Sequence, residues 1–385
     1  MSQIAPISSI HIHGVSVGEI LSVAPLIEKL RHDMPDAPLL LTCWTETAQA
    51  LAHKNYDADP MVTVERLPLD TFWNRDPFLK KHNIGLSIWI DSEIWPGWLA
   101  ALKKRGIPAM IVNGRMSERS FKRWCLARFY AQRVLRLYTR IDAQSRQDAH
   151  FFNALGGKAE PQPVNLKYLR PPTPADPALL ATFAVSIKGR PVVLHAMTHP
   201  GDESHAFVQH IALKQTFPDL LTINVPRHPH RAEELAAEAK SLGLKTQLRS
   251  ESDSIDADTD VFFGNTIGET GLYYGLSPIA VMGKSFDPNH IGGQSPIEAA
   301  YEGCAILCGP YMTNFPAIME DLKEAEAVTI AADMEEAEAY LVQWLAVPNA
   351  YRDQGNNAKA MIQGKLAQGP TYLASLIDFI KANRV

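Results

Sequence analysis

The chain has 385 residues, of which 46% are hydrophobic and 21% are charged. This length suits two domains of ordinary size, and the composition excludes a fibrous, disordered or disulfide-stapled protein. The net charge of −5 gives no global basic field for nucleic acid, and the four scattered cysteines lack zinc-site spacing, so we expect a cytoplasmic chain with reduced thiols.

The first half of the chain alternates strand-like and helix-like patterns. Helical patterns include Pro96–Lys104 and Glu118–Leu137. Such alternation predicts βαβ units and a parallel sheet. The strand-like runs are Ser9–His13, Pro38–Cys43, Met61–Leu67, Gly85–Ile90, Ala109–Asn113 and Arg140–Ala143.

A proline-rich stretch, Arg170–Pro177, predicts a linker over residues 169–189 between a domain at 1–168 and a second α/β domain at 190–385. Its last helix, around Tyr372–Lys381, is expected to pack back on the first domain. Two doubly wound, Rossmann-like domains facing a central cleft describe the GT-B architecture, in the α/β class. Nucleotide-sugar epimerases share it, so fold alone leaves the function open. The second series of strand-like runs is Arg190–Ala196, Leu220–Pro226, Leu244–Leu248, Thr259–Gly264, Ile279–Gly283, Ala305–Cys308 and Ala327–Ile330.

The first candidate catalytic residue is Glu19, in His11-Ile-His-Gly-Val-Ser-Val-Gly-Glu19, where a buried strand runs into a helix. Ligands of doubly wound sheets bind beyond the carboxyl ends of the strands, where this junction points. A carboxylate there can act as a general base. The alternative is a first-turn acid that complements the helix dipole, which is a common arrangement.

Two more acids follow a strand in Ser87-Ile-Trp-Ile-Asp-Ser-Glu-Ile-Trp-Pro96. Pro96 suits the first position of a helix, and we expect Asp91 or Ser92 to cap that helix. Glu93 is then the acid left to face the cleft. Lys167 precedes the linker and is therefore expected near the same cleft, although most lysines are surface charges.

Residues 115–140 form a basic, amphipathic segment in an acidic chain. One acid, Glu118, accompanies its basic residues, and aromatic side chains lie between them. The pattern fits an anionic membrane surface or a phosphorylated acceptor, and the alternative is a solvated polar face over a packed apolar one. The basic residues are Arg115, Arg119, Lys122, Arg123, Arg128, Arg133, Arg136 and Arg140.

Polar turns follow several strands of the second half. Backbone N–H groups at glycine-rich helix starts bind phosphate, Arg227 can neutralise it, and Glu269 or Glu298 can accept hydrogen bonds from ribose hydroxyls. Recurrence of such turns at one sheet edge predicts a nucleotide site. No histidine pair has helical ligand spacing with a carboxylate, so no metal site is predicted. The turns are Thr198-His-Pro-Gly-Asp-Glu203, Pro226-Arg-His-Pro-His-Arg231, Gly264-Asn-Thr-Ile-Gly-Glu269 and Gly292-Gly-Gln-Ser-Pro-Ile-Glu298.

Taken in order, these strings resemble those of the 3-deoxy-D-manno-oct-2-ulosonic acid (Kdo) transferases of lipopolysaccharide biosynthesis. The resemblance runs from about residue 10 to residue 320, and the order of the strings makes it specific. The matching strings are His13-Gly-Val-Ser-Val-Gly-Glu19, Asp91-Ser-Glu-Ile-Trp-Pro96, Asn113-Gly-Arg-Met-Ser-Glu-Arg-Ser-Phe121, Asn165-Leu-Lys167, Thr198-His-Pro-Gly201, Pro226-Arg-His-Pro229, Asn265-Thr-Ile-Gly-Glu269, Gly292-Gly-Gln-Ser-Pro-Ile-Glu298 and Gly309-Pro-Tyr-Met-Thr-Asn-Phe315.

The resemblance implies an inverting GT-B glycosyltransferase that moves Kdo from CMP-Kdo to a hydroxyl of a phosphorylated lipid A precursor (lipid IVA), without a metal or other cofactor. The first domain would then bind the acceptor and the second the CMP-sugar donor. Glu19 would be the general base, with Glu93 and Lys167 supporting the transition state. The residues implied to hold CMP are Pro226, Arg227, Ile267, Gly268, Glu269, Ser295, Pro296, Ile297 and Glu298.

The chain departs from the family pattern in the donor domain. Family members usually have asparagine for Ser295, often histidine for Gln294, and serine for Met197. A related GT-B enzyme with another CMP-ulosonate or nucleotide sugar and a different acceptor, or an epimerase, therefore stays an alternative. Few residues precede the first motif, where the family has a hydrophobic anchor. Membrane contact is therefore expected to be peripheral, on the cytoplasmic face of the inner membrane, through the Arg115–Arg140 segment.

Overall fold

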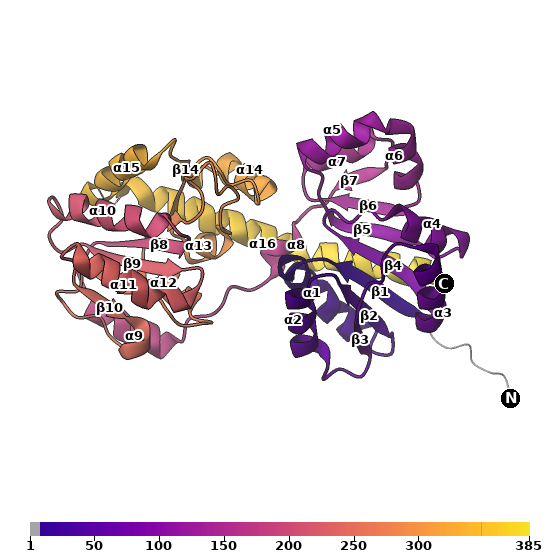
Figure 1. The fold of residues 1–385 in the computed structure, drawn as a ribbon, viewed down its shortest axis with the longest axis horizontal. Helices are drawn as coiled ribbons and strands as arrows, with labels where there is room; N and C mark the ends of the chain where they lie inside the picture. The colour runs from indigo at the N-terminus through magenta and orange to yellow at the C-terminus, as the bar shows by residue number, and fades with distance from the viewer. Residues whose placement is uncertain (1–7, 348) are drawn as a thin grey trace. The chain divides into compact units, whose positions relative to one another are not determined.

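The computed structural model describes residues 8–347 and 349–385 and divides the chain into two compact units (Figure 1). The first unit contains Met1–Arg170 and Lys365–Val385, and the second contains Pro171–Gly364. Helix α16 (Asn349–Asn383) begins in the second unit and ends in the first. Each unit is described by itself.

The first unit is built on a parallel, seven-stranded sheet in the order β3-β2-β1-β4-β5-β6-β7. The central strands β1 and β4 are buried along their whole length. Strand β4 is accordingly a nearly continuous apolar run, whereas β1 alternates isoleucines with the buried His11 and His13. The strands are β1 (Ser9–Gly14), β2 (Leu39–Cys43), β3 (Val62–Arg66), β4 (Ile84–Ile90), β5 (Ala109–Gly114), β6 (Arg140–Ala143) and β7 (Ala159–Pro161).

The strand order of this sheet reverses between β1 and β4, since β2 and β3 lie on one side of β1 and the later strands lie on the other. Right-handed crossovers therefore place helices on both faces of the sheet. The helices are α1 (Val17–Asp33), α2 (Glu46–Tyr56), α3 (Phe72–His82), α4 (Pro96–Lys104), α5 (Glu118–Leu126), α6 (Arg128–Leu135), α7 (Arg146–Ala154) and α8 (Leu166–Leu169).

The second unit repeats the plan with a parallel, seven-stranded sheet in the order β10-β11-β9-β8-β12-β13-β14, which reverses between β8 and β12. The strands are β8 (Val192–Thr198), β9 (Leu221–Pro226), β10 (Thr246–Leu248), β11 (Val261–Phe263), β12 (Ile279–Met282), β13 (Ala305–Cys308) and β14 (Val328–Ile330). The helices are α9 (Pro177–Ser186), α10 (Asp202–Lys214), α11 (Ala232–Ser241), α12 (Thr270–Leu276), α13 (Ile297–Glu302), α14 (Pro316–Glu324) and α15 (Met334–Ala346), with short 3₁₀ turns at Pro229–Arg231 and Arg249–Glu251.

The prediction of two doubly wound α/β sheets is confirmed, with three local differences. The short strand β7 was not predicted, and α9 lies inside the stretch predicted as a linker. The helix predicted over Glu118–Leu137 is broken at Ala127, where the backbone leaves helical geometry (φ −119°, ψ 40°). No residue of α5 is buried, whereas Ala131, Val134 and Leu135 of α6 are. Across the described ranges, we find no helix long and apolar enough to cross a bilayer.

Candidate active site

The reversal point of the first sheet gathers the acids that the sequence singles out. Ligands of doubly wound sheets bind beyond the carboxyl ends of the strands at such a point. Glu19 lies in the first turn of α1, directly after β1. Asp91 and Glu93 follow β4, which pairs with β1. The two strand ends therefore bring these carboxylates to one edge of the sheet.

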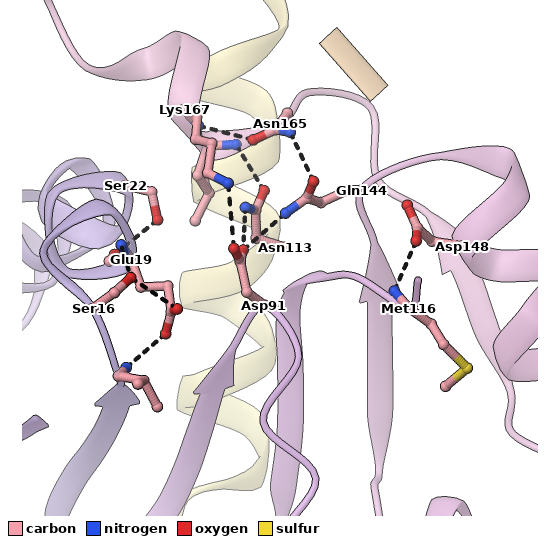
Figure 2. A network of polar contacts seen from close by, with 12 residues as sticks. Ser16, Glu19, Ser22, Asp91, Asn113, Met116, Gln144, Asp148, Asn165 and Lys167 are labelled. Carbon is pink, nitrogen blue, oxygen red and sulfur yellow. Dashed lines mark hydrogen bonds and ion pairs between the residues drawn. The ribbon is translucent and has the colours of Figure 1, made fainter. Parts of the chain in front are cut away.

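Glu19 is held in place by the start of its own helix (Figure 2). Its carboxylate accepts hydrogen bonds from the Val15 backbone N–H (2.6 Å) and from the Ser16 hydroxyl (2.9 Å). Ser16 in turn caps α1 by accepting from the Glu19 backbone N–H at 3.4 Å. This arrangement resembles a capping box, except that the carboxylate accepts from the N–H of Val15, the residue before the cap. It fixes the side chain while leaving each carboxylate oxygen a further lone pair.

The position of Glu19 changes its acidity. The pKa of Glu19 is raised from 4.5 to about 7. Burial is the largest cause, the charges of Asp91 and Glu93 act in the same direction, and the hydrogen bonds from Val15 and Ser16 act against it. Because the folded state disfavours the ionised form, Glu19 makes folding less favourable as pH rises from about 4.5 to about 7. A carboxylate with a pKa near neutrality is suited to take up a proton.

Asp91 is the centre of a polar network beside Glu19. One carboxylate oxygen of Asp91 accepts from the side-chain amides of Asn113 (2.7 Å) and Gln144 (2.8 Å), and the other lies 3.3 Å from Nζ of Lys167. Figure 2 shows these side chains converging from separate strand ends and from α8. Asn165 caps α8 and donates to Gln144 at 3.3 Å, so the network fixes Lys167 as well.

The expectation that Asp91 or Ser92 caps α4 is wrong. The cap position of α4 is Trp95, which makes no side-chain capping bond, and the carboxylate of Asp70 instead accepts from the Gly97 N–H at 2.9 Å. Asp91 and Asn113 both adopt left-handed backbone geometry, with φ of 57° and 61°. Asp and Asn tolerate this region better than most residues, and it turns both side chains into the network.

Glu93 lies two residues after Asp91 and is partly buried. Its carboxylate accepts from the indole N–H of Trp95 at 2.6 Å, and its backbone carbonyl accepts from the Tyr138 hydroxyl at 2.9 Å. Burial raises the pKa of Glu93, the Trp95 bond lowers it, and the charge of Asp91 raises it. The structure thus brings the three predicted residues Glu19, Glu93 and Lys167 together around Asp91. Asp91, Asn113 and Gln144 were not predicted as site residues.

The residues predicted to hold a nucleotide follow strands of the second unit. Pro226 ends β9, and the exposed Arg227 follows it. Ile267, Gly268 and Glu269 lie in the turn after β11, where Gly268 has φ 88° and the Glu269 carboxylate accepts from the Thr266 hydroxyl and from Arg249 (2.9 Å). The remaining four, Ser295, Pro296, Ile297 and Glu298, lie at the start of α13.

The reversal point of the second sheet adds residues that were not predicted. Asp202 ties the ends of β8 and β12 together by accepting from the backbone N–H groups of His199 (2.9 Å) and Lys284 (2.7 Å). Burial and the nearby Lys284, His228, Arg227 and Arg231 lower the pKa of His199 to about 4. His199 is therefore neutral, and the cations around it make this edge suited to an anion.

An apolar and basic surface lies where α5 meets α6. Leu126 and Phe129 are 90% and 89% exposed, and Tyr130 is 53% exposed. The same two helices carry the exposed basic residues Lys122, Arg123, Arg128 and Arg133, of which Lys122 pairs with Glu118 at 2.6 Å. Large apolar side chains exposed next to cations are typical of an interaction surface.

Comparisons with known proteins agree with the sequence patterns. The family model described as 3-deoxy-D-manno-octulosonic-acid transferase (kdotransferase) matches residues 2–169. A 3-deoxy-D-manno-octulosonic acid transferase of Rickettsia felis is 30% identical over 379 residues, 97% of this chain and 80% of the relative. The one of Haemophilus influenzae is 28% identical over 379 residues, 98% of this chain and 87% of the relative.

Solved structures of low sequence identity share the fold. Anabaena Alr3699/HepE in complex with UDP has a TM-score of 0.62 at 13% identity, covering 98% of this chain and 100% of that one. UDP-GlcNAc 2-epimerase from Neisseria meningitidis bound to UDP-GlcNAc has a TM-score of 0.60 at 10% identity, covering 97% and 100%. These structures show a shared fold. Near full-length similarity to the transferases identifies the chain as a member of the 3-deoxy-D-manno-octulosonic acid transferase family, a family of glycosyltransferases.

Proposed function

We propose that this enzyme transfers Kdo from CMP-Kdo to a hydroxyl of a phosphorylated lipid A precursor, with inversion, in lipopolysaccharide biosynthesis. The observation that carries the proposal is Glu19, whose carboxylate has a pKa of about 7 and lies at the reversal point of the first sheet. Family membership supplies the donor and acceptor classes. The second unit would bind the donor, and the first would bind the acceptor.

In the proposed reaction, Glu19 takes the proton of the acceptor hydroxyl. The acceptor oxygen then forms a bond to the anomeric carbon of Kdo, while the bond from that carbon to the phosphate of CMP breaks and the electron pair leaves with CMP. Glu93 and the Asp91–Lys167 pair orient groups around the proton transfer in the first unit. In the second unit, the cations near His199 are suited to bind the phosphate of CMP. No metal or other cofactor enters this scheme.

Donor choice is tested by thermal unfolding with nucleotides. A ligand that binds only the folded state raises the melting temperature, so CMP should raise it more than UDP or GDP at equal concentration. Arg227→Gln should weaken CMP binding about 10- to 100-fold, because a hydrogen bond to a charged group contributes about 1.5–3 kcal/mol. Lys240→Gln, in the exposed last turn of α11, is the control. A larger shift with UDP would favour an epimerase-like enzyme and contradict the proposed donor.

We also propose that the α5–α6 surface contacts anionic lipid on the cytoplasmic face of the inner membrane. Each basic residue near such a surface contributes about 1 kcal/mol, and buried apolar side chains add to this. The double variant Leu126→Ser, Phe129→Ser should lose at least about tenfold in co-sedimentation with phosphatidylglycerol vesicles. Val185→Ser, which removes a 75% exposed apolar side chain from α9, should bind as wild type does. Equal binding by all three proteins would contradict the proposed surface.

A further inference from the structure

A row of buried polar side chains crosses the apolar centre of the first sheet. His11 and His13 of β1, Thr42 of β2 and Ser87 of β4 are at most 2% exposed. The Thr42 hydroxyl lies 2.8 Å from Nε2 of His11 and 2.8 Å from Nδ1 of His13, and the Ser87 hydroxyl lies 2.8 Å from Nδ1 of His11. Burying such groups costs free energy unless each is hydrogen-bonded, so the hydrogen bonds within the row must offset this cost.

The row ends at the candidate active site. Nε2 of His13 is buried and has no hydrogen-bond partner among the described residues, and it lies 3.9 Å from a carboxylate oxygen of Glu93. The ring of His13 is held edge-on between Trp89 (5.2 Å between ring centroids) and Trp95 (6.1 Å), and Trp95 donates to the same carboxylate. The packing of the His13 ring thus holds Nε2 close to the Glu93 carboxylate.

The number of available protons limits which groups of this row can donate and which can accept. Burial lowers the pKa of His13 to about 3 and that of His11 well below its usual range, so each ring is neutral and carries one N–H. Thr42 has one hydroxyl proton and can donate it to one ring only. If Thr42 donates to Nδ1 of His13, the proton of His13 lies on Nε2. If Nδ1 instead carries the proton and donates it to the Thr42 hydroxyl or to the Thr42 backbone carbonyl, Nε2 is bare.

A protonated Nε2 and a bare Nε2 have opposite effects on the stability of the ionised Glu93 carboxylate. An N–H on Nε2 attracts the Glu93 carboxylate, whereas a bare lone pair at the same distance repels it, and the low local polarity strengthens both effects. The arrangement compatible with an ionised Glu93 therefore runs from Ser87 through His11 and Thr42 to His13, with Ser87 donating to His11, His11 to Thr42, and Thr42 to His13.

We propose that His13 is a positioning residue of the transfer site, whose proton is fixed on Nε2 by Thr42 so that it favours the ionised, correctly oriented carboxylate of Glu93. This rests on the proposed role of Glu93 in the reaction. The other groups that bear on Glu93 are the carboxylates of Asp91 and Glu19, the indole N–H of Trp95 and the hydroxyl of Tyr138. None of them contacts Thr42, so a change at Thr42 reaches Glu93 through His13.

A matched pair of substitutions at Thr42 separates this role from simple packing. Thr42→Val keeps the shape and removes the hydroxyl, whereas Thr42→Ser keeps the hydroxyl and removes a methyl group. The pH profile of kcat should contain an ionisation that Glu93→Gln abolishes. Thr42→Val should move that ionisation upward by about one pH unit, and Thr42→Ser should leave it in place. Equal profiles for the two variants, whatever their stabilities, would overturn the proposal.

A second measurement needs neither a variant nor catalysis. Nitrogen-15 NMR of the wild-type protein with labelled histidine distinguishes protonated from bare ring nitrogens, and it should show the proton of His13 on Nε2 at neutral pH. A proton on Nδ1 would overturn the proposal. If Glu93→Gln leaves the kcat profile unchanged while NMR finds the Nε2 proton, the role proposed for Glu93 in the reaction fails, and the orientation of His13 by Thr42 stands.

Discussion

Replacing Glu19 with glutamine is expected to lower turnover by about 10²- to 10⁴-fold, the usual contribution of a general base. Glutamine serves in a capping box as well as glutamate does, so Glu19→Gln should preserve the cap on α1 that Ser16 and Glu19 form. The variant therefore removes the base without removing the fold. Initial rates of Kdo transfer measure the loss, and thermal unfolding with CMP should show unchanged donor binding.

The control for this substitution is Glu46→Gln. Glu46 occupies the first turn of α2, after the Thr45 cap, but its side chain is exposed. The Glu46→Gln enzyme should turn over like wild type, since Glu46 is also a first-turn acid of a helix that follows a strand but lacks the burial of Glu19. In wild type, the rate should rise with pH as Glu19 loses its proton around pH 7, and Glu19→Gln should abolish that rise. A Glu19→Gln enzyme with near-normal turnover would refute the assignment.

Asp91→Asn is expected to cause the largest loss of stability among the site variants. Removing its charge weakens the bonds from Asn113, Gln144 and Lys167 together, for a loss of about 3 kcal/mol. The melting temperature of the first unit should fall by about 6–12 °C, as measured by calorimetry. Asparagine keeps the tolerance for the left-handed backbone at position 91, so the loss reports the charge.

Asp148 provides a matched comparison, because it is also buried and accepts hydrogen bonds. Its partners are the Met116 N–H (2.8 Å) and the Ser145 hydroxyl (2.6 Å), and the charge of Arg115 also acts on it. Asp148→Asn should therefore cost only about 1 kcal/mol. Asp91→Asn should also lower the pH at which the rate rises, since the charge of Asp91 raises the pKa of Glu19. Equal destabilisation by the two substitutions would show that the network around Asp91 contributes no more to stability than the hydrogen bonds of Asp148.

Much of the fold follows from the sequence because its signals are local. Continuous apolar runs such as Ile84–Ile90 form buried parallel strands, and Pro96 marks the start of α4 where the structure has it. The break at Ala127 has no such signal, since alanine favours helix, and it arises because α5 and α6 pack differently. The three-residue strand β7 is too short to show a period.

The site was only partly predictable for a related reason. Glu19 and Glu93 stand directly after strands, where an acid is conspicuous. Asp91 looked like a helix cap, because its real partners, Asn113, Gln144 and Lys167, are far away in sequence and meet it only in the folded sheet. The same holds in the second unit for Lys284, whose nearness to His199 depends on the pairing of β8 with β12.

A single transfer reaction tests both that this enzyme transfers Kdo and that Glu19 is its base. Wild-type and Glu19→Gln proteins should be incubated with CMP-Kdo, generated in situ, and a lipid A precursor, and the lipid analysed by mass spectrometry. Wild type should yield a lipid heavier by a Kdo residue, and Glu19→Gln should yield little or none of it under the same conditions. An unchanged lipid from a folded, CMP-binding wild-type enzyme, or equal product from both proteins, would contradict it.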